Sequence, residues 1–184
     1  MSRGWSRART VSEARPAPLD PERLFAVLAR HRVDYVLIGG LAAVLHGSAL
    51  VTNDADICPD RDPVNLERLA AALHDLDARV RTPTEPDGLP FACDAEFLAR
   101  VEMLNLETAA GQFDLAFDPA GVGGYDALLA HAVTYEIDGL EVRVAALTDI
   151  IRSKQTANRL KDQAALPHLY ALEDEIAARD AQSN

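Results

Sequence analysis

The chain has 184 residues and a formal net charge of −11, with 48% of its residues hydrophobic and 26% charged. This length supports one domain with a hydrophobic core and is too short for two domains of ordinary size. The acidic excess argues against broad electrostatic binding of nucleic acid, which needs a surplus of Lys and Arg on the binding face, although it still permits a local basic groove.

The start of the chain differs in composition from the rest. Residues 1–18 contain arginines, serines and prolines without hydrophobic periodicity, so we predict a mobile leader followed by a single domain over residues 19–184. The leader has no apolar segment typical of a signal peptide, and the longest apolar run is too short to span a bilayer. Cys58 and Cys93 have no metal-binding spacing and are interpreted as buried thiols. We therefore expect a cytoplasmic protein.

The first half of the domain is expected to alternate helices and strands. Proline after a capping Asp predicts a helix start, a short β-prone run that ends in two glycines predicts a buried strand, and leucines at helical spacing predict an amphipathic helix. These patterns predict a helix from Asp20 to His31, a strand over 34–38, a short helix to Leu45, a strand over 55–58 and a helix opened by Pro63.

The second half is expected to be richer in strands. The prolines of residues 82–93 predict a loop, and Asp138-Gly139 is a hairpin signal. We predict strands over 101–107, 113–117, 134–137 and 140–144, a helix from 124 to 132, and a helical C-terminal segment from about 147, with Thr148 as its cap and a break near Asn158. The fold class is therefore α/β (α+β), with a mixed β-sheet flanked by helices.

Two aspartates lie two residues apart at the second expected strand. Asp54 and Asp56 would therefore point to the same side of the sheet. Adjacent carboxylates repel each other and resist desolvation, so we expect a cation between them. Asp114 interrupts a later hydrophobic strand that could pair beside the first. The alternative is that these acids are only a solvent-facing alternation and an edge charge.

The ligand set formed by three such acids would contain only oxygen atoms. Hard oxygen ligands favour Mg²⁺, which is usually held by one or two carboxylates together with substrate phosphates. Three inward carboxylates can hold two ions, one activating an attacking hydroxyl and the other clamping a triphosphate. The sequence therefore predicts metal ligands at Asp54, Asp56 and Asp114.

Gly39 and Gly40 end a strand and lead into a helix. This arrangement exposes backbone N–H groups and lets a phosphate approach closely, although a plain tight turn would explain the same pair. A dinucleotide-binding unit fits poorly. The G-x-G-x-x-G spacing is absent, and one acid on a ribose would not explain a second acid two residues away.

Taken together, these motifs resemble the nucleotidyltransferase superfamily, whose hallmark is a Gly-Gly or Gly-Ser turn, then Asp-x-Asp on a strand, and a third acid on a later strand. The segments most similar to the branch of abortive-infection type nucleotidyltransferase toxins and related tRNA-modifying toxins are Gly39–Gly47, Thr52–Asp56, Gly111–Leu115 and Leu147–Asp162. The resemblance covers roughly residues 22–172. One departure is Leu50, where members commonly carry an arginine.

The last of these segments also supplies positive charge. Lys154, Arg159 and Lys161 could neutralise a triphosphate, with Lys154 the first candidate and Asp162 orienting Lys154 or Arg159. Exposed side chains pairing with Asp162 at helical spacing would explain the same pattern. Two hydroxyl residues in the nearby loop are further candidates for phosphate contacts, or are simply turn caps. They are Ser48 and Thr52.

The resemblance implies a metal-dependent enzyme that moves NMP from an NTP to an acceptor hydroxyl and releases pyrophosphate. The cofactor would be Mg²⁺ or Mn²⁺, the acceptor the 3′ end of tRNA, and the partner a protein antitoxin. The acidic net charge suits a small-molecule or protein acceptor at least as well. A catalytically inactive nucleotide-binding module is the remaining alternative, and the complete set of three acids argues against it.

Overall fold

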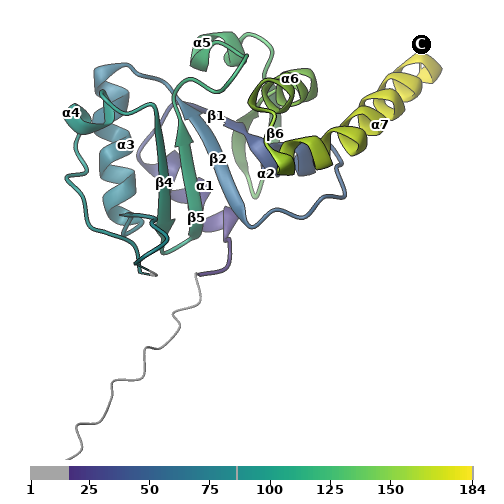
Figure 1. Ribbon diagram of the computed structural model, residues 1–184. Coiled ribbons are helices and arrows are strands. Elements are labelled where there is room, and N and C mark those ends of the chain that lie inside the picture. The colour runs from purple at the N-terminus through teal and green to yellow at the C-terminus, as the bar shows by residue number, and fades with distance from the viewer. Residues whose placement is uncertain (1–16, 86, 184) are drawn as a thin grey trace, which may run out of the picture.

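A computed structural model describes residues 17–85 and 87–183, so residues 1–16 of the expected leader lie outside the described residues. Its centre is a mixed sheet in which the strands follow the order β3-β4-β5-β2-β1-β7-β6 (Figure 1). The strands are β1 (Tyr35–Ile38), β2 (Asp54–Pro59), β3 (Arg79–Val80), β4 (Met103–Thr108), β5 (Gly111–Ala116), β6 (Val133–Ile137) and β7 (Leu140–Val144).

Pairing in the sheet is both parallel and antiparallel. Strand β2 pairs parallel with β5 and antiparallel with β1, while β1 pairs parallel with β7. The other three pairs are antiparallel: β4 pairs with β5 and with the short β3, and β6 pairs with β7. The predicted mixed sheet is therefore confirmed, and β2 and β5, which carry the three acids, are neighbours near its middle.

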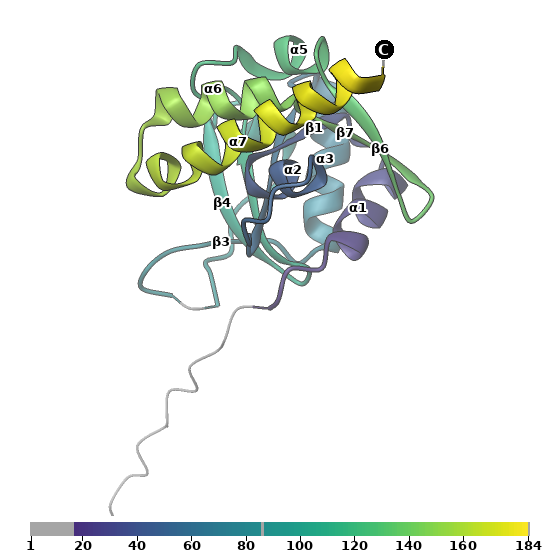
Figure 2. The same cartoon turned by 90° about the vertical axis from the view of Figure 1, so that its right-hand side faces the viewer.

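Helices flank this sheet on both sides. They are α1 (Pro21–Arg30), α2 (Gly39–Leu45), α3 (Pro63–Asp75), α4 (Ala95–Leu98), α5 (Gly124–Leu129), α6 (Leu147–Ala157) and α7 (Leu160–Ser183). Helices α1 and α3 contact each other, whereas α2, α6 and α7 lie together on another side of the molecule (Figure 2). None of the described helices is both long and apolar enough to cross a bilayer.

Local sequence explains where the first helices begin. The Asp20 carboxylate accepts a hydrogen bond from the backbone N–H of Arg23, and the Asp62 carboxylate accepts one from that of Val64, each just before a proline at the first helical position. The predicted hairpin turn is also confirmed. Asp138 and Gly139 both have positive φ angles, 50° and 77°, as a type I′ turn between β6 and β7 requires.

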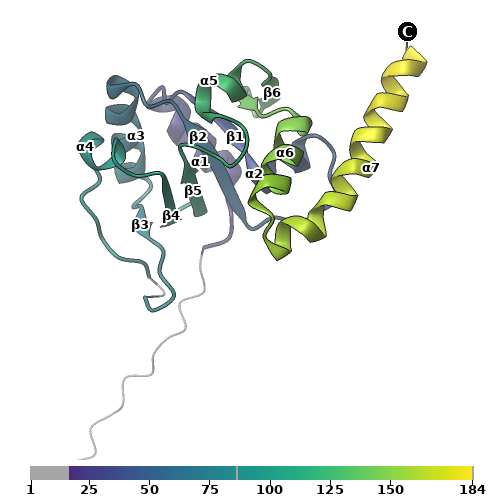
Figure 3. The ribbon, with the colours of Figure 1, turned by 45° about the horizontal axis from the view of Figure 1, so that its top comes forward.

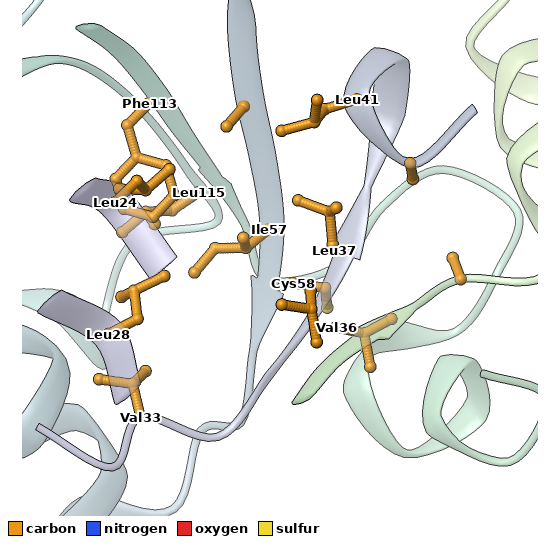
Figure 4. Close-up of a cluster of buried hydrophobic side chains, with 14 of the residues drawn as sticks. Leu24, Leu28, Val33, Val36, Leu37, Leu41, Ile57, Cys58, Phe113 and Leu115 are labelled. Carbon is orange, nitrogen blue, oxygen red and sulfur yellow. The ribbon is translucent and has the colours of Figure 1, made fainter. Parts of the chain in front are cut away.

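The hydrophobic core fixes which face of the central strands is buried. Ile57 of β2 and Phe113 and Leu115 of β5 point to one face, where Leu24 and Leu28 of α1 pack against them (Figure 4). Side chains alternate between the two faces of a strand, so Asp54, Asp56 and Asp114 must point to the opposite face. Burial of the apolar face therefore holds the acids on the side not covered by α1.

The C-terminal segment is two helices rather than one. Asn158 ends α6 in the left-handed conformation with φ 49°, so the predicted break is confirmed. The prediction of Thr148 as the cap is wrong: α6 begins one residue earlier, at Leu147, and its cap position is Ala146, which makes no side-chain capping bond. Helix α7 then runs for 24 residues, and its end projects away from the sheet (Figure 3).

Candidate active site

Three partly buried carboxylates meet on the face of β2 and β5 that α1 does not cover. The parallel register places Asp56 directly opposite Asp114, and Asp54 lies two residues earlier on the same face. One oxygen from each of the three side chains lies within 4.8 Å of the others. The structure thus brings together the acids that the sequence predicts as metal ligands.

The surroundings of the cluster disfavour its negative charge. Burial, then the neighbouring charges of Asp54 and Asp114, raise the pKa of Asp56 from 3.8 to about 7, against the opposing effect of Lys161 and Lys154. Burial also raises the pKa of Asp114. Nearby positive charge favours the ionised form of these carboxylates, which is the electrostatic demand that a divalent cation meets.

The two glycines approach the acids closely. Gly39 has φ +71°, and a Cβ atom there would lie 2.1 Å from Oδ2 of Asp56. A Cβ on Gly40 would lie 2.6 Å from the hydroxyl oxygen of Thr52. A larger residue would collide with Asp56 at the first position and with Thr52 at the second, so both positions need glycine for space, and Gly39 also needs it for its backbone conformation.

The two hydroxyl residues have different surroundings. The hydroxyl of Thr52 donates to Oδ1 of Asp54 at 2.6 Å and therefore orients that carboxylate. The Ser48 hydroxyl accepts a hydrogen bond from the backbone N–H of Leu50 at 3.2 Å, which is a turn contact. Thr52 and Leu50 both line the cleft that contains the acids, so Leu50 places an apolar side chain in its wall.

Cations from α6, from the turn that follows it and from α7 complete the polar wall. Asp162, whose side chain is 0% exposed, accepts from Nζ of Lys154 at 3.4 Å and from Nε of Arg159 at 2.6 Å. Burial would raise the pKa of Asp162, but the hydrogen bond and charge of Arg159, with Lys154, lower it overall. The contact with Lys154 forms because the turn at Asn158 brings the start of α7 back beside α6, whereas Arg159 is only three residues before Asp162.

Lys161 is the third cation of this wall. It lines the same cleft, and its charge acts on Asp56. Among the residues that the structure describes, it forms no ion pair, unlike Lys154 and Arg159. The chain contains only two lysines, Lys154 and Lys161, and both therefore lie at the cleft.

The cleft has a volume of about 630 Å³, which is within the range of small-molecule sites. Acids, glycines and cations form its polar wall. The apolar part of the wall comes from the segments that follow β5 and β7 and from α5 and α6, through Val122, Ala145, Leu128 and Ile150. A ligand that fits this cleft would combine an anionic portion with a portion that tolerates apolar contact.

Sequence reasoning missed one residue of the cluster. Arg81, which follows β3, donates from one guanidinium nitrogen to both carboxylate oxygens of Asp114, each at 2.8 Å. Its side chain is 27% exposed. The available signal was the Arg-Val-Arg alternation of residues 79–81, but the two-residue strand β3 is too short to predict from periodicity.

Asp162→Asn is expected to destabilise the fold. The change leaves Lys154 and Arg159 facing a neutral amide in a fully buried position, which should cost roughly 2–4 kcal/mol of unfolding free energy. Urea denaturation measures the loss. Asp174→Asn, an exposed change in the same helix, should alter the unfolding free energy little. Equal losses in the two variants would contradict the role of Asp162 as the buried partner of the two cations.

Metal-free protein is expected to lose stability as the pH rises from about 4 to about 7. The raised pKa of Asp56, about 7, means that the folded state keeps a proton which the unfolded chain has already released, so the unfolding free energy falls on the order of 3 kcal/mol over this range. Urea denaturation in EDTA at several pH values measures the fall. Asp56→Asn should remove most of it, and an unchanged slope would contradict the assignment.

Comparison with known proteins supports the fold and does not identify a family. No protein-family profile and no curated protein sequence matches the chain. A candidate nucleotidyltransferase from Thermotoga maritima is similar in structure, with a TM-score of 0.52 and 16% identity over 80% of this chain and 88% of that one. The lincosamide antibiotic adenylyltransferase LnuA, bound to lincomycin, gives 0.54 and 12% over 85% and 99%.

A third similar structure is the antibiotic-resistance factor ANT(2″)-Ia, with a TM-score of 0.50 and 15% identity over 88% of this chain and 91% of that one. All three identities are low, so the comparisons establish the architecture alone. The chain has a nucleotidyltransferase fold, and its three clustered acids lie on neighbouring central strands of that fold.

Proposed function

We propose that this chain is a metal-dependent nucleotidyltransferase, which moves NMP from an NTP to an acceptor hydroxyl and releases pyrophosphate. One observation carries the proposal: Asp54, Asp56 and Asp114 converge in the same cleft as the glycine turn and the lysines. Catalysis of this transfer is mostly positioning and charge neutralisation, so acids, glycines and cations are sufficient for it.

The residues present fit a divalent metal. The ligand set is all carboxylate, the three oxygens lie within 4.8 Å, and burial raises the pKa of two of the acids. Such ligands suit Mg²⁺ or Mn²⁺, held by Asp54, Asp56 and Asp114. When bound, the ion would neutralise the triphosphate and the carboxylates. Thr52 fixes the orientation of Asp54 through its 2.6 Å hydrogen bond.

The remaining cleft residues would hold the triphosphate. Gly39 and Gly40 leave room for phosphate oxygens beside the acids, where a Cβ atom would otherwise stand. Lys154, Arg159 and Lys161 would neutralise the phosphates, with Asp162 orienting the first two. The Ser48 hydroxyl accepts a hydrogen bond from the backbone of Leu50, and Ser48 is not among the described residues that line this cleft, so we do not include it in the proposed triphosphate site.

The transfer step would form a bond between the acceptor oxygen and the α-phosphorus and break the bond from that phosphorus to the oxygen bridging to the β-phosphate. Pyrophosphate leaves with the electron pair of the broken bond. The hydroxyl proton would pass to Asp114, whose pKa is raised by burial. Asp114 would therefore serve the acceptor side, and Asp54 and Asp56 the nucleotide side.

The 3′ end of tRNA is our first candidate for the acceptor, with the chain acting as the toxin of a toxin–antitoxin pair. This assignment rests on the motif segments Gly39–Gly47, Thr52–Asp56, Gly111–Leu115 and Leu147–Asp162. A small-molecule hydroxyl is the second candidate. It is favoured by the net charge of −11 and by the structural similarity to LnuA, an antibiotic adenylyltransferase.

Transfer of labelled α-phosphate separates these acceptors. Purified protein, Mg²⁺ and each of the four α-labelled NTPs would be offered total tRNA, lincomycin with other hydroxylated small molecules, or a protein extract. Label on one acceptor class identifies it, and the Asp54→Ala, Asp56→Ala double variant should label none. If wild type labels nothing, or the double variant labels equally well, the proposed activity is wrong.

A further inference from the structure

The position of Arg81 is set by the sheet. Its backbone N–H donates to the carbonyl of Asn105 at 2.8 Å, and Asn105 pairs in register with Asp114 across β4 and β5. The side chain then reaches Asp114, where one guanidinium nitrogen contacts both oxygens at 2.8 Å. Arg81 is therefore held by its backbone hydrogen bond to β4 and by its contact with the carboxylate on β5.

The three acids are not equivalent in their neighbours. Within residues 17–85 and 87–183, no cation forms an ion pair with Asp54 or Asp56, whereas Asp114 has Arg81 in direct contact. A guanidinium stays charged at every accessible pH. One of the three carboxylates therefore carries a permanent positive partner belonging to the chain, and the other two do not.

We propose that Arg81 takes the place of a second, acceptor-side divalent ion, so that the chain works with one ion, on the nucleotide side, and neutralises Asp114 by itself. This inference rests on the proposed function for metal binding and refines it: Asp54 and Asp56 would supply most of the negative charge around the one ion, and the charge of Asp114 would be offset by Arg81 instead of by a second ion. A second dication at Asp114 would have to displace Arg81 or stand beside it, and like charges this close repel strongly.

Arg81 cannot perform every role of the metal ion that it would replace. A guanidinium neutralises charge and donates hydrogen bonds, but it cannot coordinate a hydroxyl oxygen as a metal does. Arg81 is therefore a positioning residue: it holds Asp114 in place and offsets its charge, while Asp114 faces the acceptor. The two-ion arrangement that three carboxylates allow would return only when the guanidinium is removed.

Counting bound Mn²⁺ tests the proposal without relying on activity. The full chain would be saturated with an NTP analogue that cannot be cleaved at the α-phosphate, and free Mn²⁺ followed by electron paramagnetic resonance. We expect one Mn²⁺ per chain in wild type and in Arg81→Lys, which keeps the charge, and two in Arg81→Gln. Arg79→Gln is the matched control. Arg79 is two residues earlier, and in the described part of the chain its guanidinium donates hydrogen bonds to the backbone carbonyls of Asp87 and Gly88 and forms no ion pair with an acid.

Activity supplies a second measurement. At low Mn²⁺ the rate of Arg81→Gln should fall on the order of 10²-fold, because Asp114 loses its counter-charge, and it should recover as Mn²⁺ is raised and a second ion binds. The Arg79→Gln rate should follow wild type at every Mn²⁺ concentration. Thermal unfolding would verify that each variant is folded.

The outcomes distinguish this inference from the proposed function. Two ions in wild type, or one ion in folded Arg81→Gln, would overturn the role of Arg81 and leave nucleotidyl transfer standing. No saturable Mn²⁺ binding in wild type would instead remove the metal site on which both proposals depend. A count of one in wild type that rises to two only in Arg81→Gln supports the inference.

Discussion

Asp56→Asn is expected to lower the rate of NMP transfer at least about 10³-fold while leaving the protein folded. Asp56 lies opposite Asp114 and directly beside Gly39, so its carboxylate is central to the proposed metal site. Asparagine keeps the shape of the side chain but supplies neither the negative charge nor the second carboxylate oxygen. Steady-state transfer of labelled α-phosphate to the acceptor measures the loss.

The fold should tolerate this substitution because the wild-type acid is itself unfavourable. Burial and two neighbouring acids raise the pKa of Asp56, and a neutral amide removes that repulsion, so the melting temperature of the metal-free variant at pH 8 should equal or exceed that of wild type. Asp118→Asn, an exposed acid just after β5, is the matched control and should retain full activity. An active Asp56→Asn, or an inactive Asp118→Asn, would contradict the proposed site.

Gly39→Ala is expected to lower the unfolding free energy by roughly 3 kcal/mol or more and to abolish transfer. Two causes combine at this position. The φ angle of +71° is costly for any residue with a Cβ atom, and that atom would lie 2.1 Å from the Asp56 carboxylate. The collision can be relieved only by moving β2 or the turn, and either movement displaces a residue of the cleft.

Gly139→Ala separates these two causes. Gly139 has φ +77° in the β6–β7 turn, and a Cβ there would meet no atom within 4 Å. This variant should therefore lose only the conformational part, on the order of 1 kcal/mol, and keep its activity. Urea denaturation of both variants, with the transfer assay, gives the comparison. Equal losses of stability would show that contact with the acid cluster adds nothing at Gly39.

Much of the fold follows from local patterns. The proline after Asp20 and the leucines after Pro63 predict their helices because capping and helical periodicity act over a few residues. Thr148 shows the limit of such rules: a good capping residue lies inside α6, because Leu147 is buried and the helix begins with it. Strand β3 escapes prediction because two residues carry no periodicity and their place depends on β4.

Local sequence patterns predict some residues of the candidate site but not the contacts between them. Asp54 and Asp56 are predictable as a pair because strand geometry alone puts them on one face, and Asp114 because it interrupts a hydrophobic strand. Their contacts with other segments depend on tertiary packing. The sequence cannot show that Arg81 crosses β4 to reach Asp114, nor that Asp162 is fully buried beneath Lys154. Charged residues far apart in the chain acquire partners only when the sheet and helices assemble.

The distribution of lysine gives the protein an unusual chemical surface. Its 18 basic residues include only Lys154 and Lys161 as lysines, and both line the cleft, while the two cysteines are buried. Apart from the amino terminus of the chain, reagents that attack primary amines would therefore react inside the cleft. Dyes, crosslinkers or resins coupled through lysine would block the site under study. Attachment through an added terminal tag would leave it open.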